Sequence, residues 1–136
     1  YGWGRESRPN FATWLLSNLS EGRRVGVITD QAASPTLNTN LAEMLLEIAD
    51  RGILGILHTA GASRVTRYEA AIALAEVFKL DASLIEPITS DELNWIARRP
   101  KDSSLNVSKA RRILRNGPLE LKEALLTMKR ERGSLK

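Results

Sequence analysis

Two short stretches of the sequence hold the residues best suited to bind a polar ligand. The first, TDQAASPT at residues 29–36, places Asp30, Gln31, Pro35 and Thr36 between an expected strand and an expected helix. Pro and Ser in such a stretch can form a turn for purely local reasons. In open α/β sheets, however, ligands bind at the carboxyl ends of strands, and polar side chains are needed there. The stretch is therefore either a simple turn or a ligand-binding loop.

The second stretch, RRPKD, concentrates positive charge in a polar loop. Arg98 and Arg99 offer two guanidiniums and Lys101 an ammonium, and together they could hold a diphosphate by charge-assisted hydrogen bonds. Asp102 could accept hydrogen bonds from the hydroxyls of a sugar. The alternative is an ordinary surface loop whose charges are solvated.

The sequence offers no complete catalytic or metal centre. It contains no cysteine, a single histidine (His58), no G-x-G-x-x-G turn and no P-loop. Tyr68 is followed four residues later by Ile72, where a lysine would be needed to lower the pKa of the phenol. We therefore expect no catalytic residue, no metal and no bound cofactor in this chain alone.

Composition is typical of a globular protein, but charge is unevenly distributed. Hydrophobic residues make up 43% of the 136 residues and charged residues 26%. Residues 98–136 hold 12 Lys and Arg against 4 Asp and Glu, a net charge of +8, which favours an anionic partner such as phosphate, diphosphate or nucleic acid. No apolar run approaches the ~18 residues of a membrane span. We expect a cytoplasmic protein, and the initial Tyr1 suggests a piece of a longer one.

Helical and extended patterns alternate along the first two-thirds of the chain, which predicts the α/β class. Expected helices begin at the N-cap Asn10, at Asn40 with Glu43 in a capping-box-like pair, and at the T-x-x-E box of Thr66. The second of these helices should bury Leu41, Leu45, Ile48 and Ala49.

Three strands are expected, and they are too few for a stable parallel sheet. Residues 24–30 and 84–89 read as short strands, and Pro87 puts the latter at an edge. Residues 53–57 form a continuous apolar run, typical of a strand covered on both faces. Short helices are expected from Ser90 and over 108–114, and a final helix with Pro118 at its first position. The strand at 53–57 therefore needs neighbours that this chain does not contain.

Several motifs in the same order resemble those of one family. NFATWLL, DQ-x-x-SPT followed by NLA, GILHTAG with RYEAA, and RRPKDSSL are similar to the C-terminal part of the dTDP-4-dehydrorhamnose reductase family of extended short-chain dehydrogenases/reductases. The resemblance covers nearly the whole chain. It implies an α/β substrate-binding lobe, residues 1–136 as a single domain, and a strand and helix that would complete the parallel sheet of a Rossmann-like fold.

The resemblance implies a reductase that uses NADP or NAD to reduce a nucleotide-linked 4-keto sugar. Its cofactor turn and its catalytic Thr/Ser, Tyr and Lys would lie upstream of this chain, so an N-terminal nucleotide-binding domain is an expected partner, and a homo-oligomer is possible. Arg99 would bind the diphosphate and Asp102 the ribose. Asn10 would begin a helix beside the substrate, and Gln31 and Thr36 would line the strand-end loop. Asn40 replaces the family's usual Asp and would still cap its helix.

Two other functions are compatible with the sequence. A regulatory subunit of methionine adenosyltransferase resembles the same family, so the chain could come from a relative without catalytic activity. The segment SKARRILRNG, together with the basic C-terminal quarter, also suggests a nucleic-acid-binding module. The scattered positions of Trp3, Trp14 and Trp95 argue against that module, because no stacking platform is evident.

Overall fold

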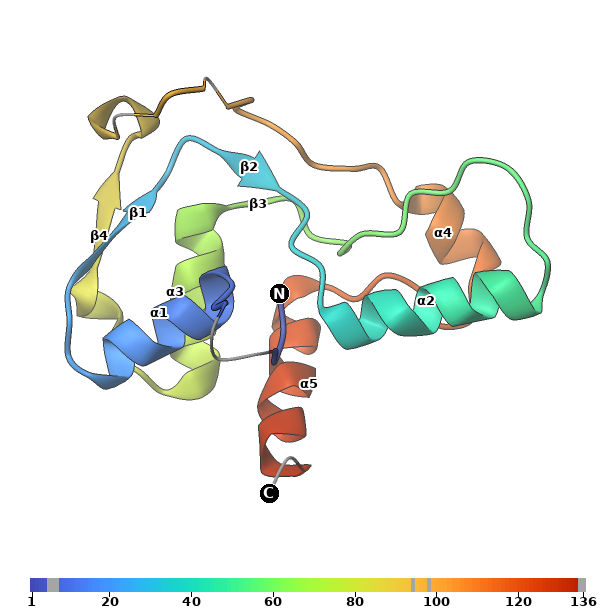
Figure 1. The fold of residues 1–136 in the computed structure, drawn as a ribbon, viewed down its shortest axis with the longest axis horizontal. Coiled ribbons are helices and arrows are strands. Elements are labelled where there is room, and N and C mark those ends of the chain that lie inside the picture. The colour runs from blue at the N-terminus through green and yellow to red at the C-terminus, as the bar shows by residue number, and fades with distance from the viewer. Residues whose placement is uncertain (5–7, 94, 98, 135–136) are drawn as a thin grey trace.

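The computed structural model describes residues 1–4, 8–93, 95–97 and 99–134, and it has the predicted α/β class. The elements are α1 Phe11–Ser20, β1 Val25–Ile28, β2 Ala32–Ala33, α2 Asn38–Asp50, β3 Val65–Thr66, α3 Arg67–Phe78, the 3₁₀ turns Ala82–Leu84 and Ser90–Glu92, β4 Ile85–Ile88, α4 Ser108–Ile113 and α5 Leu121–Ser134. Figure 1 shows two lobes, one built from α1, α3, α5, β1 and β4 and the other from α2 and α4, with β2 and β3 between them. No helix in the described part of the chain is long and apolar enough to cross a membrane.

The larger lobe encloses the main hydrophobic core. Strands β1 and β4 pair in parallel, with Val25 opposite Ile85, and α3 packs on them and against α1 and α5. Leu15, Leu74 and Met128 from the three helices are fully buried in this core. Pro87 lies in β4, which pairs only with β1 among the described residues, so the missing N–H of Pro87 costs no ladder bond and the predicted edge position is confirmed.

Two of the predicted helix starts are confirmed by their caps. The Oδ1 atom of Asn10 accepts hydrogen bonds from the backbone N–H groups of Ala12 (3.0 Å) and Thr13 (3.3 Å) at the start of α1. Thr66 and Glu69 form the reciprocal capping box at the start of α3. These signals were readable because a cap acts over three residues and needs no distant partner.

The smaller lobe has its own core around Met44, which is fully buried and contacts Ala110 and Leu114. The predicted apolar stripe of α2 was half wrong, since Leu45 is 50% exposed and Ala49 is also exposed. The buried face passes instead through Leu41, Met44 and Ile48 at the helical spacing i, i+3, i+7.

The prediction that Asn40 caps α2 was wrong. The N-cap is Leu37, three residues earlier, and Asn40 lies within the first turn of the helix at 4% exposure. Its Nδ2 donates to the carbonyl of Gly117 (3.1 Å), and its Oδ1 accepts from the N–H of Leu119 (3.3 Å). Asn40 therefore joins α2 to the segment before α5, and an Asp there could not make the bond to Gly117 because a carboxylate has no donor.

The start of the final helix and the extent of the helix after Thr89 also differ from prediction. Pro118 is not the first residue of α5, which begins at Leu121; the N–H groups of Leu119 and Leu121 donate to the side chains of Asn40 and Ser63. The helix expected from Ser90 to Trp95 is one 3₁₀ turn that ends at Glu92.

Residues 53–57 do not form the predicted strand. Ile53 and Leu57 pack against the smaller core, while Leu54 and Ile56 are 90% and 81% exposed. Gly55 adopts φ +91°, which interrupts an extended run. The described residues supply no neighbouring strand to pair with this backbone, and the Lys109 ammonium donates to the carbonyl of Ile56 (2.7 Å).

We expect Asn40→Ala to lower the free energy of unfolding by about 1–3 kcal/mol, because it leaves the partly buried backbone groups of Gly117 and Leu119 without their partner. Urea denaturation measures the loss. Glu43→Ala, an exposed change on the same helix, is the control and should stay within about 0.5 kcal/mol. Equal losses in the two variants would contradict the bridging role of Asn40.

The exposed pair Leu54 and Ile56 should promote self-association, or binding to a further part of a longer protein, because both side chains leave water on contact. Sedimentation at rising concentration should show association that the double change to Ser abolishes. Leu126→Ser, at a residue of α5 that is 46% exposed, should leave the association unchanged. A monomer at every concentration, with no uptake of a dye for apolar surfaces, would show that the pair needs no partner.

Candidate functional site

A narrow band of extended backbone lies between the two lobes and carries the candidate site. The N–H of Ala32 in β2 donates to the carbonyl of Lys101 (2.8 Å), and the carbonyl of Ala32 accepts from the N–H of Ser103 (2.9 Å). On the other side β2 pairs antiparallel with β3, with Ala32 opposite Thr66 (Figure 1). The loop after β1 and the RRPKD loop are therefore held side by side, although about 70 residues separate them.

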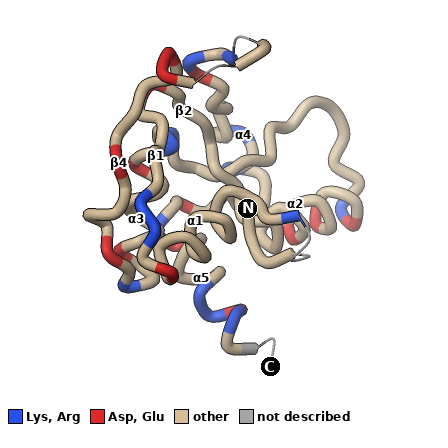
Figure 2. Tube along the Cα trace, turned by 60° about the vertical axis from the view of Figure 1, so that its left-hand side comes forward, with Lys and Arg blue, Asp and Glu red and all other residues tan. Residues whose placement is uncertain are grey.

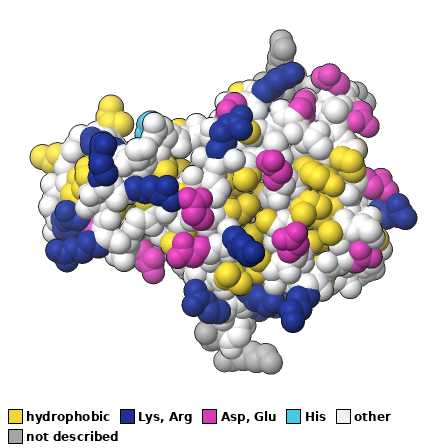
Figure 3. Space-filling view, turned by 180° about the vertical axis from the view of Figure 1, so that it is seen from behind, with side chains coloured by type: hydrophobic (Ala, Val, Ile, Leu, Met, Phe, Trp, Pro, Cys, Tyr) yellow, Lys and Arg dark blue, Asp and Glu magenta, His cyan; other side chains and the backbone are white. Residues whose placement is uncertain are grey.

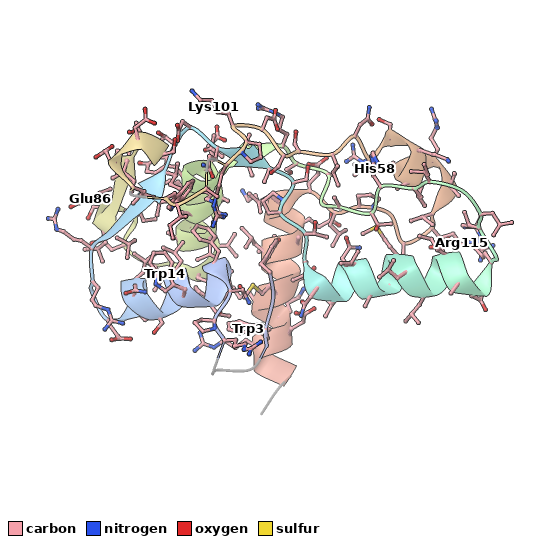
Figure 4. The ribbon with its side chains drawn as sticks, turned by 45° about the horizontal axis from the view of Figure 1, so that its top comes forward. Trp3, Trp14, His58, Glu86, Lys101 and Arg115 are labelled. Atoms are coloured by element: carbon pink, nitrogen blue, oxygen red, sulfur yellow. The ribbon has the colours of Figure 1, made fainter. Side chains whose placement is uncertain are left out.

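Above this band lies an open cleft of about 560 Å³. Its polar lining comes from Gln31, Ser90, Asp91, Arg99 and Lys101, and its apolar lining from Leu93, Trp95, Ile96 and Ala97. Figure 4 labels Lys101 at the upper edge of the molecule, where its side chain projects outward.

One wall of the cleft is fixed by Asp30 at the end of β1. Its carboxylate accepts hydrogen bonds from the N–H (3.0 Å) and the hydroxyl (2.6 Å) of Ser90. These bonds, helped by the nearby ammonium of Lys101, hold the pKa of Asp30 below its usual value. Asp30 stays ionised and holds the 3₁₀ turn Ser90–Glu92 beside the end of β1.

The lining of the cleft also includes a cation that stands over an aromatic ring. The guanidinium carbon of Arg99 lies 4.6 Å from the centre of the Trp95 ring, within the range of a cation–π interaction. Trp95 is half-buried and Arg99 is exposed, so the cation forms the outer surface at this point. Arg98, the other guanidinium predicted for this loop, lies outside the described residues.

Of the five predicted site residues, the structure brings Gln31 and Arg99 together. Gln31 is 8% exposed, its carbonyl accepts from the N–H of Arg67 (3.2 Å), and its side chain lines the cleft. Gln31, which is buried, and Arg99, which is exposed, therefore line one cleft although they come from two separate loops.

Thr36 does not line this cleft. Its Oγ1 donates to the carbonyl of Ser34 (3.0 Å) and accepts from the N–H of Gly61 (2.9 Å). A Cβ atom added at Gly61 would stand 2.0 Å from the carbonyl oxygen of Pro35, so only glycine allows this close approach. Within the described residues, the hydrogen bonds of Thr36 join the loop 30–38 to the segment before β3.

Asp102 also lies outside the lining of the cleft. Its carboxylate accepts from the N–H (2.9 Å) and hydroxyl (2.7 Å) of Ser104 and from Nε of Arg64 (2.8 Å). These bonds lower the pKa of Asp102 to about 2. Asp102 is ionised at neutral pH and ties the RRPKD loop to the residues before β3.

Asn10 is placed by its cap. Besides the two bonds at the start of α1, its Nδ2 donates to the carbonyl of Gly2 (2.7 Å). Gly2 has φ +137°, and a Cβ there would collide with Asn38. The side chain of Asn10 thus anchors the N-terminal residues, and it is not among the residues that line the cleft.

The predicted site set missed Ser90, Asp91, Trp95 and Lys101. Lys101 was recognised as a loop cation, but nothing local showed that β2 would hold it beside Gln31. Trp95 carried one usable signal, an aromatic ring four residues before an arginine in a polar loop. In the part of the chain that the structure covers, no group of His, Asp and Glu side chains is arranged to hold a metal ion.

The basic C-terminal quarter is spread over separate places. Arg111 forms an ion pair with Glu120, Arg112 lines a second cleft of about 440 Å³ with His58, and the backbone of Arg115 binds Glu47. Figure 4 shows Arg115 near the end of α2, away from His58, and Figure 2 shows a further basic group at the end of α5. From behind, Lys and Arg stand singly or in small groups on both lobes (Figure 3).

Comparison with known proteins identifies the family to which this chain belongs. The chain matches the model of the RmlD substrate binding domain over residues 2–132. It is 38% identical to the dTDP-4-dehydrorhamnose reductase of Mycobacterium tuberculosis over 94 residues, 68% of this chain and 31% of that protein. It is 33% identical to methionine adenosyltransferase 2 subunit beta of Rattus norvegicus over 84 residues, 58% of this chain and 25% of that protein.

The fold has solved counterparts. The dTDP-4-dehydrorhamnose reductase of Bacillus anthracis, solved in complex with NADP, superposes with a TM-score of 0.84 at 22% identity, over 96% of this chain and 45% of that one. The chain thus spans less than half the length of these proteins. The family resemblance read from the motifs is confirmed, and the chain belongs to the RmlD substrate binding domain family.

Proposed function

We propose that this chain is the substrate-binding portion of an NAD(P)H-dependent reductase that reduces the 4-keto group of a nucleotide-linked deoxysugar, as the name dTDP-4-dehydrorhamnose reductase describes for its relatives. The observation that carries the proposal is the cleft in which Gln31, Arg99 and Lys101 meet. We further propose that the whole protein works in the cytoplasm.

The charges of the cleft suit a diphosphate. Arg99 can donate two parallel hydrogen bonds to phosphate oxygens, and Lys101, which lines the same cleft, adds a compact positive charge. Gln31 supplies an amide that can both donate and accept, which suits the hydroxyls of a sugar. Asp91 is the acidic residue among the lining side chains, so two cations face one carboxylate there.

Asn10, Thr36 and Asp102 stay predictions as ligand-binding residues. A carboxylate has about four acceptor positions, and Arg64 and Ser104 use three of them at Asp102. One position is left for a ribose hydroxyl, on the exposed side of the loop.

Catalysis in this proposal needs more than the 136 residues. Hydride transfer requires a nicotinamide held against the keto carbon and a group that delivers a proton to the oxygen. The sequence has no Gly-rich cofactor turn and no Tyr-x-x-x-Lys pair. We propose that an N-terminal domain of the longer protein supplies both and binds NADP or NAD.

A second candidate is a relative that kept the fold without the chemistry. The match to methionine adenosyltransferase 2 subunit beta supports it, because that protein and the reductases share this portion. The nucleic-acid-binding candidate is less well supported, because the arginines of SKARRILRNG have three different environments rather than one common face.

The reductase proposal predicts that activity requires both this chain and the N-terminal domain, which an NADPH absorbance assay can measure. The full-length protein should oxidise NADPH when given dTDP-4-dehydrorhamnose, and the 136-residue chain alone should not, because it lacks the cofactor turn. Full-length protein that is inactive but binds a methionine adenosyltransferase would favour the second candidate. Turnover by the 136-residue chain alone would refute the prediction that catalysis needs the N-terminal domain.

Arg99→Ala in the full-length protein should weaken dTDP-sugar binding roughly ten- to a hundredfold, since a charge-assisted hydrogen bond is worth ~1.5–3 kcal/mol. Arg111→Ala is the matched control: its guanidinium is exposed and paired with Glu120, so binding should hardly change. Calorimetric titration measures both. Equal effects of the two changes would remove Arg99 from the site.

A further inference from the structure

Arg99 and Trp95 contact each other within the cleft. Both side chains line it, and the guanidinium stands over the face of the indole. Among the described residues no carboxylate forms an ion pair with Arg99. The ring is therefore the partner that the structure gives this cation.

The two groups prefer different ligands. An indole face attracts a cation, but it also stacks well on a planar base, which every nucleotide carries. A guanidinium gains more from two hydrogen bonds to a phosphate than from an exposed aromatic face. A ligand that carries both a base and a diphosphate would satisfy Trp95 and Arg99 separately.

We infer that Trp95 is the stacking surface for the base of a nucleoside diphosphate, and that Arg99 covers this surface until the diphosphate draws the guanidinium away. The inference rests on the proposed function and adds a residue and a ligand moiety to it. Neither the family resemblance nor the predicted site residues included Trp95.

The backbone around the pair allows this exchange without rearrangement of the fold. Two residues after Arg99, the carbonyl of Lys101 is held by Ala32 in β2. Another lining residue, Ser90, is held by Asp30. Since these backbone segments are fixed, the exchange needs rotation of the long Arg99 side chain and no movement of β2.

The arrangement couples the two halves of the ligand. A base alone must displace Arg99 from the ring, and a diphosphate alone must withdraw Arg99 without any gain at the ring. A ligand that carries both a base and a diphosphate displaces Arg99 from the ring only once. Its base then stacks on Trp95 while its diphosphate binds Arg99. Each half should therefore bind better when the other is present, which is a reciprocal coupling.

Calorimetric titration of the full-length protein with pyrophosphate, thymidine and dTDP tests the inference. In Trp95→Ala, the ratio of dTDP to pyrophosphate affinity should fall about 5- to 150-fold, because base stacking is lost. Pyrophosphate itself should bind as well as before or slightly better. Trp95→Phe, which keeps an aromatic face, should recover part of the ratio.

Arg99→Ala should change the affinities for pyrophosphate and for thymidine in opposite directions. Pyrophosphate should bind more weakly, whereas thymidine should bind about two- to fivefold more tightly because the ring is uncovered. Trp14→Ala, at an exposed position of α1, is the tryptophan control and should leave all three ligands unchanged. Thermal melting checks that each variant is folded.

The outcomes separate this inference from the proposed function. If the wild type binds dTDP and pyrophosphate but Trp95→Ala leaves their affinity ratio unchanged, Trp95 is not the stacking surface and the proposed function stands. Thymidine binding that weakens in Arg99→Ala would refute the covering role of Arg99. A wild type that binds neither dTDP nor pyrophosphate would overturn both.

Discussion

The double pairing of Ala32 is the constraint on which the candidate site depends. This one residue bonds through its backbone to Lys101 and Ser103 on one side and lies opposite Thr66 on the other. Backbone groups buried without partners are costly, so neither neighbour can leave β2 cheaply. Three segments from distant parts of the sequence are thereby fixed in register, and Gln31 is set beside the loop that carries Arg99. The cleft exists because β2 has two neighbours.

Separate hydrophobic cores flank this band and give the site rigid supports. The main core fixes the end of β1, from which Asp30 reaches Ser90, and so sets one wall of the cleft. The smaller core around Met44 holds α2 and α4 together, and with them one end of each loop that crosses between the lobes. Rigid elements therefore position side chains that themselves lie on loops, an arrangement common to binding sites.

The two helix caps that act locally were predicted correctly, whereas features that depend on distant partners were not. The caps at Asn10 and Thr66 act within three residues, so their types and spacing sufficed. Asn40 looked like a third cap, but its partners are about 77 residues away at Gly117, and no local pattern distinguishes the two uses. Residues 53–57 have the composition of a covered strand, yet strands need neighbours, and the described chain provides none. The family resemblance pointed to Arg99 and Gln31, which both line the cleft, whereas the place of Trp95 could be seen only in the three-dimensional structure.

The indole of Trp3 donates its N–H to the carbonyl of Met128 (2.7 Å), a contact that spans 125 residues. Met128 lies in the main core, so this core takes in residues from near both ends of the described chain. A ribosome makes the chain from its N-terminus, at about 5–20 residues per second. Helix α1 and strand β1 must therefore wait several seconds, with Leu15 and Val27 uncovered, before α5 emerges to pack on them. Protein synthesis thus exposes the nascent chain to chaperones and to aggregation for longer than its size alone suggests.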